Sequence, residues 1–88
     1  MIKFLVAYFV YIVECADSTY YVGSTNDLKK RLIQHNNSKQ GAHYTKIRRP
    51  VHLKYSEQVE TLNEARRREA EIKSWKRDKK AELFLGIE

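Results

Sequence analysis

Ten consecutive residues near the N-terminus, Phe4 to Val13, are all apolar, and most of them are β-branched or aromatic. Such side chains favour extended backbone, and a run without polar alternation is typical of a strand that is covered on both faces. A chain of 88 residues can bury only a modest core. We therefore expect one domain, residues 1–88, built around this strand.

The same run has some features of a secretion signal, because Lys3 precedes it. However, the run is β-branched and aromatic, and Glu14 stands where small residues should precede a cleavage site. It is also too short to span a membrane. Cys15 is the only cysteine, so no disulfide can form within the chain. We expect a cytoplasmic protein with no membrane partner.

A second strand is predicted directly after the first. Asp17 and Ser18 are turn formers, and residues 19–22 are β-branched or aromatic. Because side chains alternate between the two faces of a strand, a suitable hairpin register would point Tyr11 and Tyr21 into the same space. Gly23 would then leave room for another group to approach the backbone.

The next segment predicts a basic helix that begins near Asn26, a good N-cap, with Asp27 in its first turn. One helical stripe carries two apolar and two basic side chains, namely Leu28, Arg31, Leu32 and His35. This spacing places Arg31 and His35 one turn apart, beside the apolar side of the helix.

Three further elements complete the predicted fold. Val51 to Ser56 alternates like a strand, and His52 lies on its polar face. Thr61 and Glu64 form a capping box that starts a helix. A last helix is expected from Asp78 to a stop at Gly86. The prediction is an α/β fold: a small, mostly antiparallel three-stranded sheet flanked by three helices, in the order β-β-α-β-α-α.

The segment from Asn36 to Pro50 is polar and is expected to be irregular. The net charge of +6 favours a polyanionic partner such as nucleic acid. Cations and an aromatic residue alternate in this segment, which suits a phosphate backbone with one base stacked on the tyrosine. The residues expected to contact nucleic acid here are Lys39, His43, Tyr44, Lys46, Arg48 and Arg49. The alternative is a solvated loop with Tyr44 and Ile47 tucked into the core.

Glu69 falls on the apolar stripe of the helix predicted to start at Thr61, together with Leu62, Ala65 and Ile72. A carboxylate on a core-facing stripe is costly unless it is paired or holds a metal. The residues alone leave two kinds of partner for the Glu69 carboxylate. One is a cation, either Arg31 or Lys73, which lies at i+4 on the same helix, and the other is a metal ion.

Taken together, these residues resemble the GIY-YIG nuclease family, which is named after two short motifs on adjacent strands. Phe9-Val10-Tyr11 stands at the first motif with its glycine and isoleucine both replaced, and Tyr21-Val22-Gly23 is a conservative variant of the second. A helix arginine and a histidine one turn later match Arg31 and His35. The later Ala-x-x-x-Glu context matches Ala65 to Glu69.

The resemblance implies a metal-dependent endonuclease. Tyr11 would orient or deprotonate a water, helped by Tyr21 or His35, and Arg31 would clamp the scissile phosphate. Glu69 would hold one Mg²⁺ or Mn²⁺. Gly23 and the loop cations would contact the nucleic acid, which is expected to be DNA in preference to RNA, and the chain is expected to act as a monomer. The alternatives are a nucleic-acid-binding module with little or no catalysis, and a protein-interaction adaptor.

Overall fold

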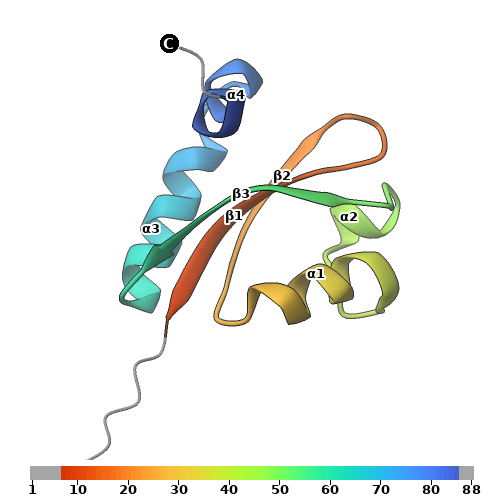
Figure 1. Cartoon of the computed structure of the whole chain (residues 1–88), viewed down its shortest axis with the longest axis horizontal. Helices are drawn as coiled ribbons and strands as arrows, with labels where there is room; N and C mark the ends of the chain where they lie inside the picture. The colour runs from red at the N-terminus through yellow and green to blue at the C-terminus, as the bar shows by residue number, and fades with distance from the viewer. Residues whose placement is uncertain (1–6, 86–88) are drawn as a thin grey trace, which may run out of the picture.

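The structure, a computed structural model, describes residues 7–85 and contains the predicted elements in the predicted order (Figure 1). One further helix, a single turn within the segment expected to be irregular, was not predicted. Phe4 to Val6 of the predicted first strand lie outside the described residues. The elements are β1 (Tyr8–Glu14), β2 (Tyr20–Thr25), α1 (Leu28–Asn37), α2 (His43–Lys46), β3 (His52–Val59), α3 (Leu62–Lys73) and α4 (Arg77–Leu85).

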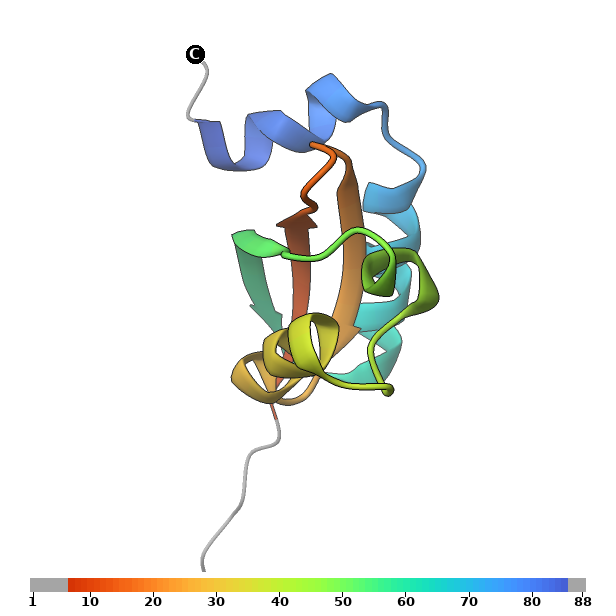
Figure 2. The same cartoon turned by 90° about the vertical axis from the view of Figure 1, so that its right-hand side faces the viewer.

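The three strands form one antiparallel sheet in the order β2-β1-β3. The apolar strand β1 takes the centre, and its residues Val10 to Val13 are at most 1% exposed. Helices α1 and α2 cover one face of the sheet, and α3 and α4 cover the other (Figures 1 and 2). None of the helices in the described part of the chain is long and apolar enough to cross a membrane.

The hairpin register brings the two tyrosines to the same face, as predicted. Tyr11 lies opposite Gly23, and Val13 lies opposite Tyr21. The turn between the strands is held by Asp17, whose Oδ1 accepts hydrogen bonds from the backbone N–H and the hydroxyl of Thr19.

Gly23 is needed because of a close approach, and the approaching group is part of the protein. A Cβ atom at this position would lie 2.4 Å from the Tyr11 hydroxyl oxygen and 2.6 Å from its ring carbon Cζ. The room that the glycine leaves is therefore filled by the Tyr11 side chain. Gly23 itself is buried, so its expected contact with nucleic acid is replaced by this packing role.

Each face of the sheet has its own apolar cluster. On the side of α3 and α4 the buried residues are Val10, Ile12, Val22, Ala65 and Ile72. On the side of α1 and α2 they are Tyr11, Val13, Cys15 and Val51. Leu62, expected on the buried stripe of α3, is the first residue of the helix and is 42% exposed.

Several predicted boundaries move by a few residues. The N-cap of α1 is Asp27 rather than Asn26, because the Asp27 carboxylate accepts a hydrogen bond from the Lys30 backbone N–H. Strand β3 continues to Val59, since pairing with β1 at the sheet edge tolerates polar side chains. Helix α4 begins at Arg77, with Asp78 already in its first turn. The predicted stop at Gly86 lies outside the described residues.

The segment between α1 and β3 is ordered by side chains that bind backbone groups. Asn36 exchanges two hydrogen bonds with the backbone of Val51, at 2.7 and 3.1 Å. Arg49 donates to the backbone oxygens of Gln34, His35 and Ser38, which lie at the C-terminal end of α1. Arg49, expected to contact nucleic acid, therefore acts as the C-terminal cap of a helix.

We predict that Arg49→Ala destabilises the protein by about 1–3 kcal/mol, because carbonyls at the end of α1 lose a charged donor. Urea unfolding at neutral pH measures the change. Lys39→Ala, an exposed cation in the same segment, is the matched control and should change stability by no more than about 0.5 kcal/mol. Equal stability of the two variants would contradict the capping role.

Candidate active site

A buried chain of hydrogen bonds links β1, α1 and α2. The Tyr11 hydroxyl lies 2.7 Å from His35 Nε2, and His35 Nδ1 lies 2.7 Å from Thr45 Oγ1. The Thr45 hydroxyl donates to the backbone oxygen of Ala42, so it must accept from His35. This order fixes the tautomer of the neutral ring: Nδ1 carries the proton, and Nε2 accepts from the Tyr11 hydroxyl.

Burial sets the protonation states of this chain. His35 and Thr45 are fully buried, and Tyr11 is 1% exposed. Burial raises the pKa of Tyr11 to about 12, although the Arg31 guanidinium acts in the opposite direction. Burial, and then the charges of Arg31 and Arg49, lower the pKa of His35 to about 4. The Arg31 guanidinium therefore favours ionisation of Tyr11, but burial outweighs it.

Tyr21 lies beside this chain and packs against α2. Its ring meets the His35 ring edge to face at 5.3 Å and stacks on the Tyr44 ring at 5.9 Å between centroids. The Arg48 guanidinium covers Tyr44 at 3.8 Å and pairs with Asp17 at 3.0 Å. Tyr44, expected to stack on a base, is thus stacked within the protein. The alternative expectation placed both Tyr44 and Ile47 in the core, but Ile47 is 65% exposed.

Arg31 is positioned by the residues that follow it on and after α1. Its Nη1 donates to Gln34 Oε1 at 2.9 Å and to the Gln40 backbone oxygen at 2.8 Å. The side chain is partly exposed and lies close enough to Tyr11 to lower the pKa of its hydroxyl. The predicted stripe of α1 therefore brings Arg31 and His35 to the same tyrosine.

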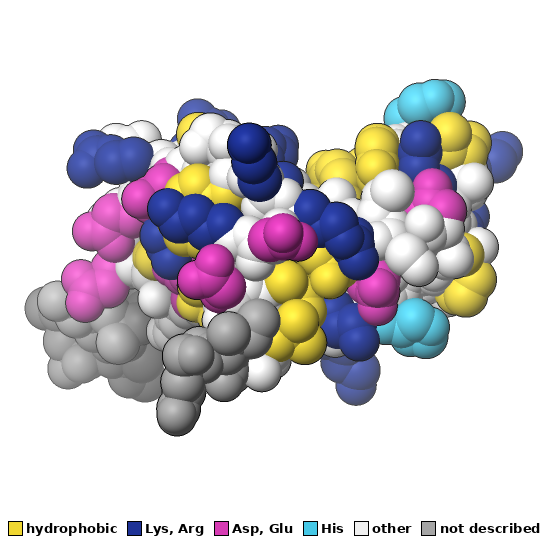
Figure 3. All heavy atoms as spheres, turned by 90° about the horizontal axis from the view of Figure 1, so that it is seen from above, with side chains coloured by type: hydrophobic (Ala, Val, Ile, Leu, Met, Phe, Trp, Pro, Cys, Tyr) yellow, Lys and Arg dark blue, Asp and Glu magenta, His cyan; other side chains and the backbone are white. Residues whose placement is uncertain are grey.

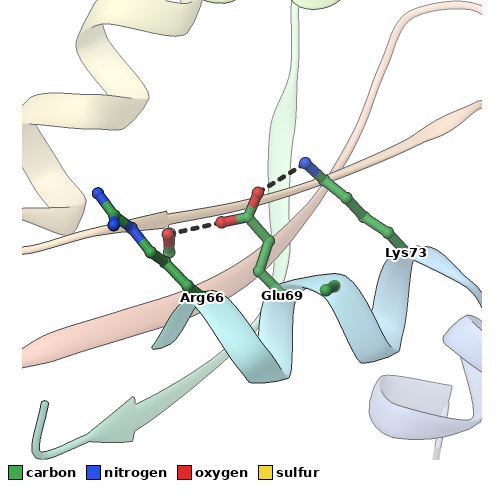
Figure 4. A pocket seen from close by; sticks show the side chains of 5 residues that line it. Arg66, Glu69 and Lys73 are labelled. Atoms are coloured by element: carbon green, nitrogen blue, oxygen red, sulfur yellow. Dashed lines mark hydrogen bonds and ion pairs between the residues drawn. The ribbon is translucent and has the colours of Figure 1, made fainter. Parts of the chain in front are cut away.

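Glu69 lies in a separate pocket between α3 and β2, lined by Ser24, Arg66, Glu69, Ala70 and Lys73 (Figure 4). One carboxylate oxygen accepts from the Ser24 hydroxyl at 2.6 Å, and the other lies 2.6 Å from Lys73 Nζ. Of the two cations considered from the sequence, the partner is thus Lys73 and not Arg31. The Glu69 side chain is 21% exposed, so solvent reaches the carboxylate.

The two parts of the site meet around the free edge of β2. Ser24 faces α3, whereas Tyr21 and Gly23 face α1. Lys73 spans the edge, since its ammonium is 6.0 Å from the Tyr21 ring centroid while it pairs with Glu69. Arg31 and Glu69 both act on the pKa of Tyr11, the first lowering it and the second raising it. The Glu69 pocket and the Tyr11–His35 pair therefore lie on opposite faces of the sheet, with Lys73 at the edge between them.

The donor set at Glu69 fits a magnesium-like ion. Among residues 7–85 no three histidine, cysteine or acidic side chains gather, so an all-protein cage is not present there. Mg²⁺ is commonly held by one or two carboxylates and completes its coordination with waters and phosphate oxygens. The Glu69 carboxylate opens to solvent, and the Lys73 side chain that shares it is half exposed, so it can move aside at little cost.

The remaining predicted contact residues are spread over the loop and α2. Lys39 and His43 are exposed and Lys46 is partly exposed, while Arg48 and Arg49 make internal contacts. Sequence reasoning did not find Thr45 or Ser24. Each is a small hydroxyl residue whose only signal is a partner distant in sequence, so no local pattern could identify it.

We predict that His35 makes the protein less stable in acid. The pKa of His35 is depressed in the folded state, so between about pH 6.5 and pH 4 the unfolded chain binds a proton that the folded chain does not. The free energy of unfolding should therefore fall as pH decreases through this window, by up to about 3 kcal/mol from this group.

Urea unfolding of the parent and of His35→Gln between pH 7 and pH 4 measures this contribution, because the variant should lose it. His52→Gln replaces an exposed histidine and should keep the pH dependence of the parent. Parallel curves for the parent and His35→Gln would show that His35 is not the responsible group.

Comparison with known proteins identifies the family. A profile of the GIY-YIG catalytic domain matches residues 7–82. A UPF0213 protein of Staphylococcus saprophyticus is 53% identical over 77 residues, covering 88% of this chain and 93% of the relative. A UPF0213 protein of Staphylococcus aureus is 52% identical over 78 residues, covering 89% and 94%.

Two solved structures share the fold. The solution NMR structure of a UPF0213 protein from Bacillus halodurans is 39% identical with a TM-score of 0.55, covering 88% of this chain and 81% of that one. The solution NMR structure of a protein from E. faecalis is 36% identical with a TM-score of 0.58, covering 84% and 78%. The chain therefore belongs to the GIY-YIG family.

Proposed function

We propose that this chain is an endonuclease that hydrolyses phosphodiester bonds in nucleic acid, with DNA as the preferred substrate, and that it uses one divalent cation held at Glu69. The observation that carries the proposal is the Tyr11–His35 hydrogen bond, with Arg31 and Glu69 both close enough to affect the pKa of Tyr11. Hydrolysis of a phosphodiester needs a proton acceptor, a cation on the phosphate and a stabilised leaving oxygen.

Tyr11 and His35 together would supply the proton acceptor. The Tyr11 oxygen accepts a proton from the attacking water while its own proton passes to His35 Nε2. The lowered pKa of His35 keeps the ring neutral at neutral pH but also makes it a weaker base, so the proton transfer from Tyr11 has to be coupled to the attack of the water. Because His35 is fully buried, it reaches the water only through Tyr11. The Thr45 hydroxyl holds the ring in the required tautomer.

Arg31 would bind the scissile phosphate beside Tyr11. Gln34 and the Gln40 backbone fix its Nη1, so the planar guanidinium is oriented before a substrate arrives. Arg31 is partly exposed and has no carboxylate partner among residues 7–85, so its positive charge is available to a phosphate.

Glu69 would hold the Mg²⁺ or Mn²⁺, with Ser24 orienting its carboxylate. Such an ion, when bound, supplies positive charge for the leaving oxygen. Lys73 has to release the carboxylate first, and its length and exposure allow it to turn toward the phosphate.

A second function, binding without hydrolysis, is favoured by one observation. Tyr11 is 1% exposed and Glu69 is already paired with Lys73, so both groups must be uncovered before they can act on a substrate. A nucleic-acid-binding module would leave them as they are.

A cleavage assay decides between the two functions. Pure protein is incubated with supercoiled plasmid, single-stranded DNA and RNA, each with Mg²⁺, Mn²⁺ or EDTA. We expect cation-dependent nicking by the parent and none by Glu69→Gln. Glu71→Gln, an exposed carboxylate on the same helix, is the matched control and should cleave normally. Binding without cleavage in every condition would favour the module.

The free energy of unfolding of Glu69→Gln is the control that separates loss of the metal ligand from loss of the fold. Since Lys73 is half exposed, removing its partner should change the free energy of unfolding by no more than about 1 kcal/mol. Residual activity of the variant with the same Mg²⁺ dependence as the parent would refute the ligand role.

We also predict that Arg31→Lys restores little of the activity lost in Arg31→Ala, because an ammonium cannot make the bidentate phosphate contact. Arg31→Ala should lower the cleavage rate about a hundredfold or more and substrate affinity far less, since the guanidinium acts on the transition state. Single-turnover cleavage and binding in EDTA separate the two effects. Equal losses in both would identify Arg31 as an ordinary backbone contact.

A further inference from the structure

Almost all of the net positive charge comes from one segment. Residues 66–80 contain eight lysines and arginines and three acidic residues, an excess of five, while the whole chain has a net charge of +6. This segment forms most of α3 and the start of α4. Figure 3 looks onto the end of the molecule with α4 and the β1–β2 turn, where Lys and Arg side chains gather with Asp and Glu among them.

The cations at the start of α4 are not neutralised by the described part of the protein. Arg68 pairs with Glu57 and Glu71, and Lys73 pairs with Glu69. In contrast, no carboxylate of residues 7–85 forms an ion pair with Lys76, Arg77, Lys79 or Lys80. Four cations without an ion pair therefore lie together at the start of α4, whereas in the loop after α1 two of the four lysines and arginines, Arg48 and Arg49, are used internally.

Two of these cations line a cavity of about 210 Å³ together with Thr19 and Tyr20. The Arg77 guanidinium lies 4.1 Å above the Tyr20 ring and donates to the Ser18 backbone oxygen. Phe84 packs edge to face on Tyr20 at 5.5 Å, so the ring that supports Arg77 is itself held. The cavity thus presents a planar donor in a fixed orientation and a lysine, which suits a phosphate group.

The cavity is aligned with the Glu69 pocket along the free edge of β2. Ser24 lines the Glu69 pocket and Tyr20 lines the cavity. Four strand residues span roughly 13 Å, a distance that a few nucleotides of one strand can bridge. Lys73 lines the Glu69 pocket, and its ammonium is 6.0 Å from the Tyr21 ring centroid.

We propose that the cavity lined by Thr19, Tyr20, Arg77 and Lys80 binds a phosphodiester of the substrate strand, a few nucleotides from the phosphate at the Glu69 pocket. The site deepens the proposed function and rests on it for the identity of the strand. The substrate backbone then follows the edge of β2 toward α4, and the loop after α1 serves to hold His35 and Tyr21.

The test is binding of a fluorescent single-stranded DNA of about twelve nucleotides in EDTA, where no cation-dependent cleavage occurs. Arg77→Gln with Lys80→Gln should lower affinity about tenfold and reduce the slope of log K against log salt by about 1.4. Lys29→Gln with Lys30→Gln removes the same charge from exposed positions on α1 and should change affinity less than about twofold.

The single variant Lys80→Gln controls for misfolding of the double variant. Arg77 also contacts the β1–β2 turn, whereas the Lys80 side chain makes no hydrogen bond among residues 7–85. The single variant should produce about half of the slope change. Equal losses in the α1 control and the double variant would overturn the site, as would a parent that does not bind the probe.

Failure of this site and failure of the nuclease proposal give different results. A parent that cleaves, together with a double variant that binds as tightly as the parent, refutes the site alone. A parent that never cleaves, together with a double variant that binds more weakly, supports the site and refutes hydrolysis.

Discussion

The hydrogen bond between the Tyr11 hydroxyl and His35 Nε2 is the contact on which the rest of the structure depends. It requires a hairpin register that sets Tyr11 against Gly23, because only a glycine leaves space for the ring. It also requires α1 to present His35 to the sheet, and α2 to bring Thr45 to the far side of the imidazole. A polar pair this deeply buried is tolerated because each group has a partner.

The buried pair and the charges around it play complementary parts. Burial keeps Tyr11 and His35 neutral, since it raises the pKa of the first and lowers that of the second. The two charged residues, Arg31 and Glu69, are partly exposed, so solvent lowers the free-energy cost of keeping them charged. In the proposed mechanism the buried pair would carry the proton, and an anionic substrate and a cation would meet at the exposed charges.

Sequence patterns predicted the parts of the site that follow from local periodicity. The alternation of strand residues placed Tyr11 and Tyr21 on one face, and helical spacing placed Arg31 beside His35. Contacts between segments distant in sequence had no such signal. Thr45 and Arg49 lie in a stretch without periodicity, so their binding to His35 and to the end of α1 appeared only in three dimensions. The stripe of α3 placed Glu69 correctly but could not choose its partner.

The order of the elements along the chain determines when the site can first exist. Ser24 and Glu69 are joined across 45 residues, and Glu69 belongs to the last but one helix. A growing chain exposes its N-terminal elements first. A nascent chain that ends before α3 therefore has the tyrosines, the arginine and the histidine, but not the carboxylate. The topology therefore leaves the site incomplete until α3 has been synthesised.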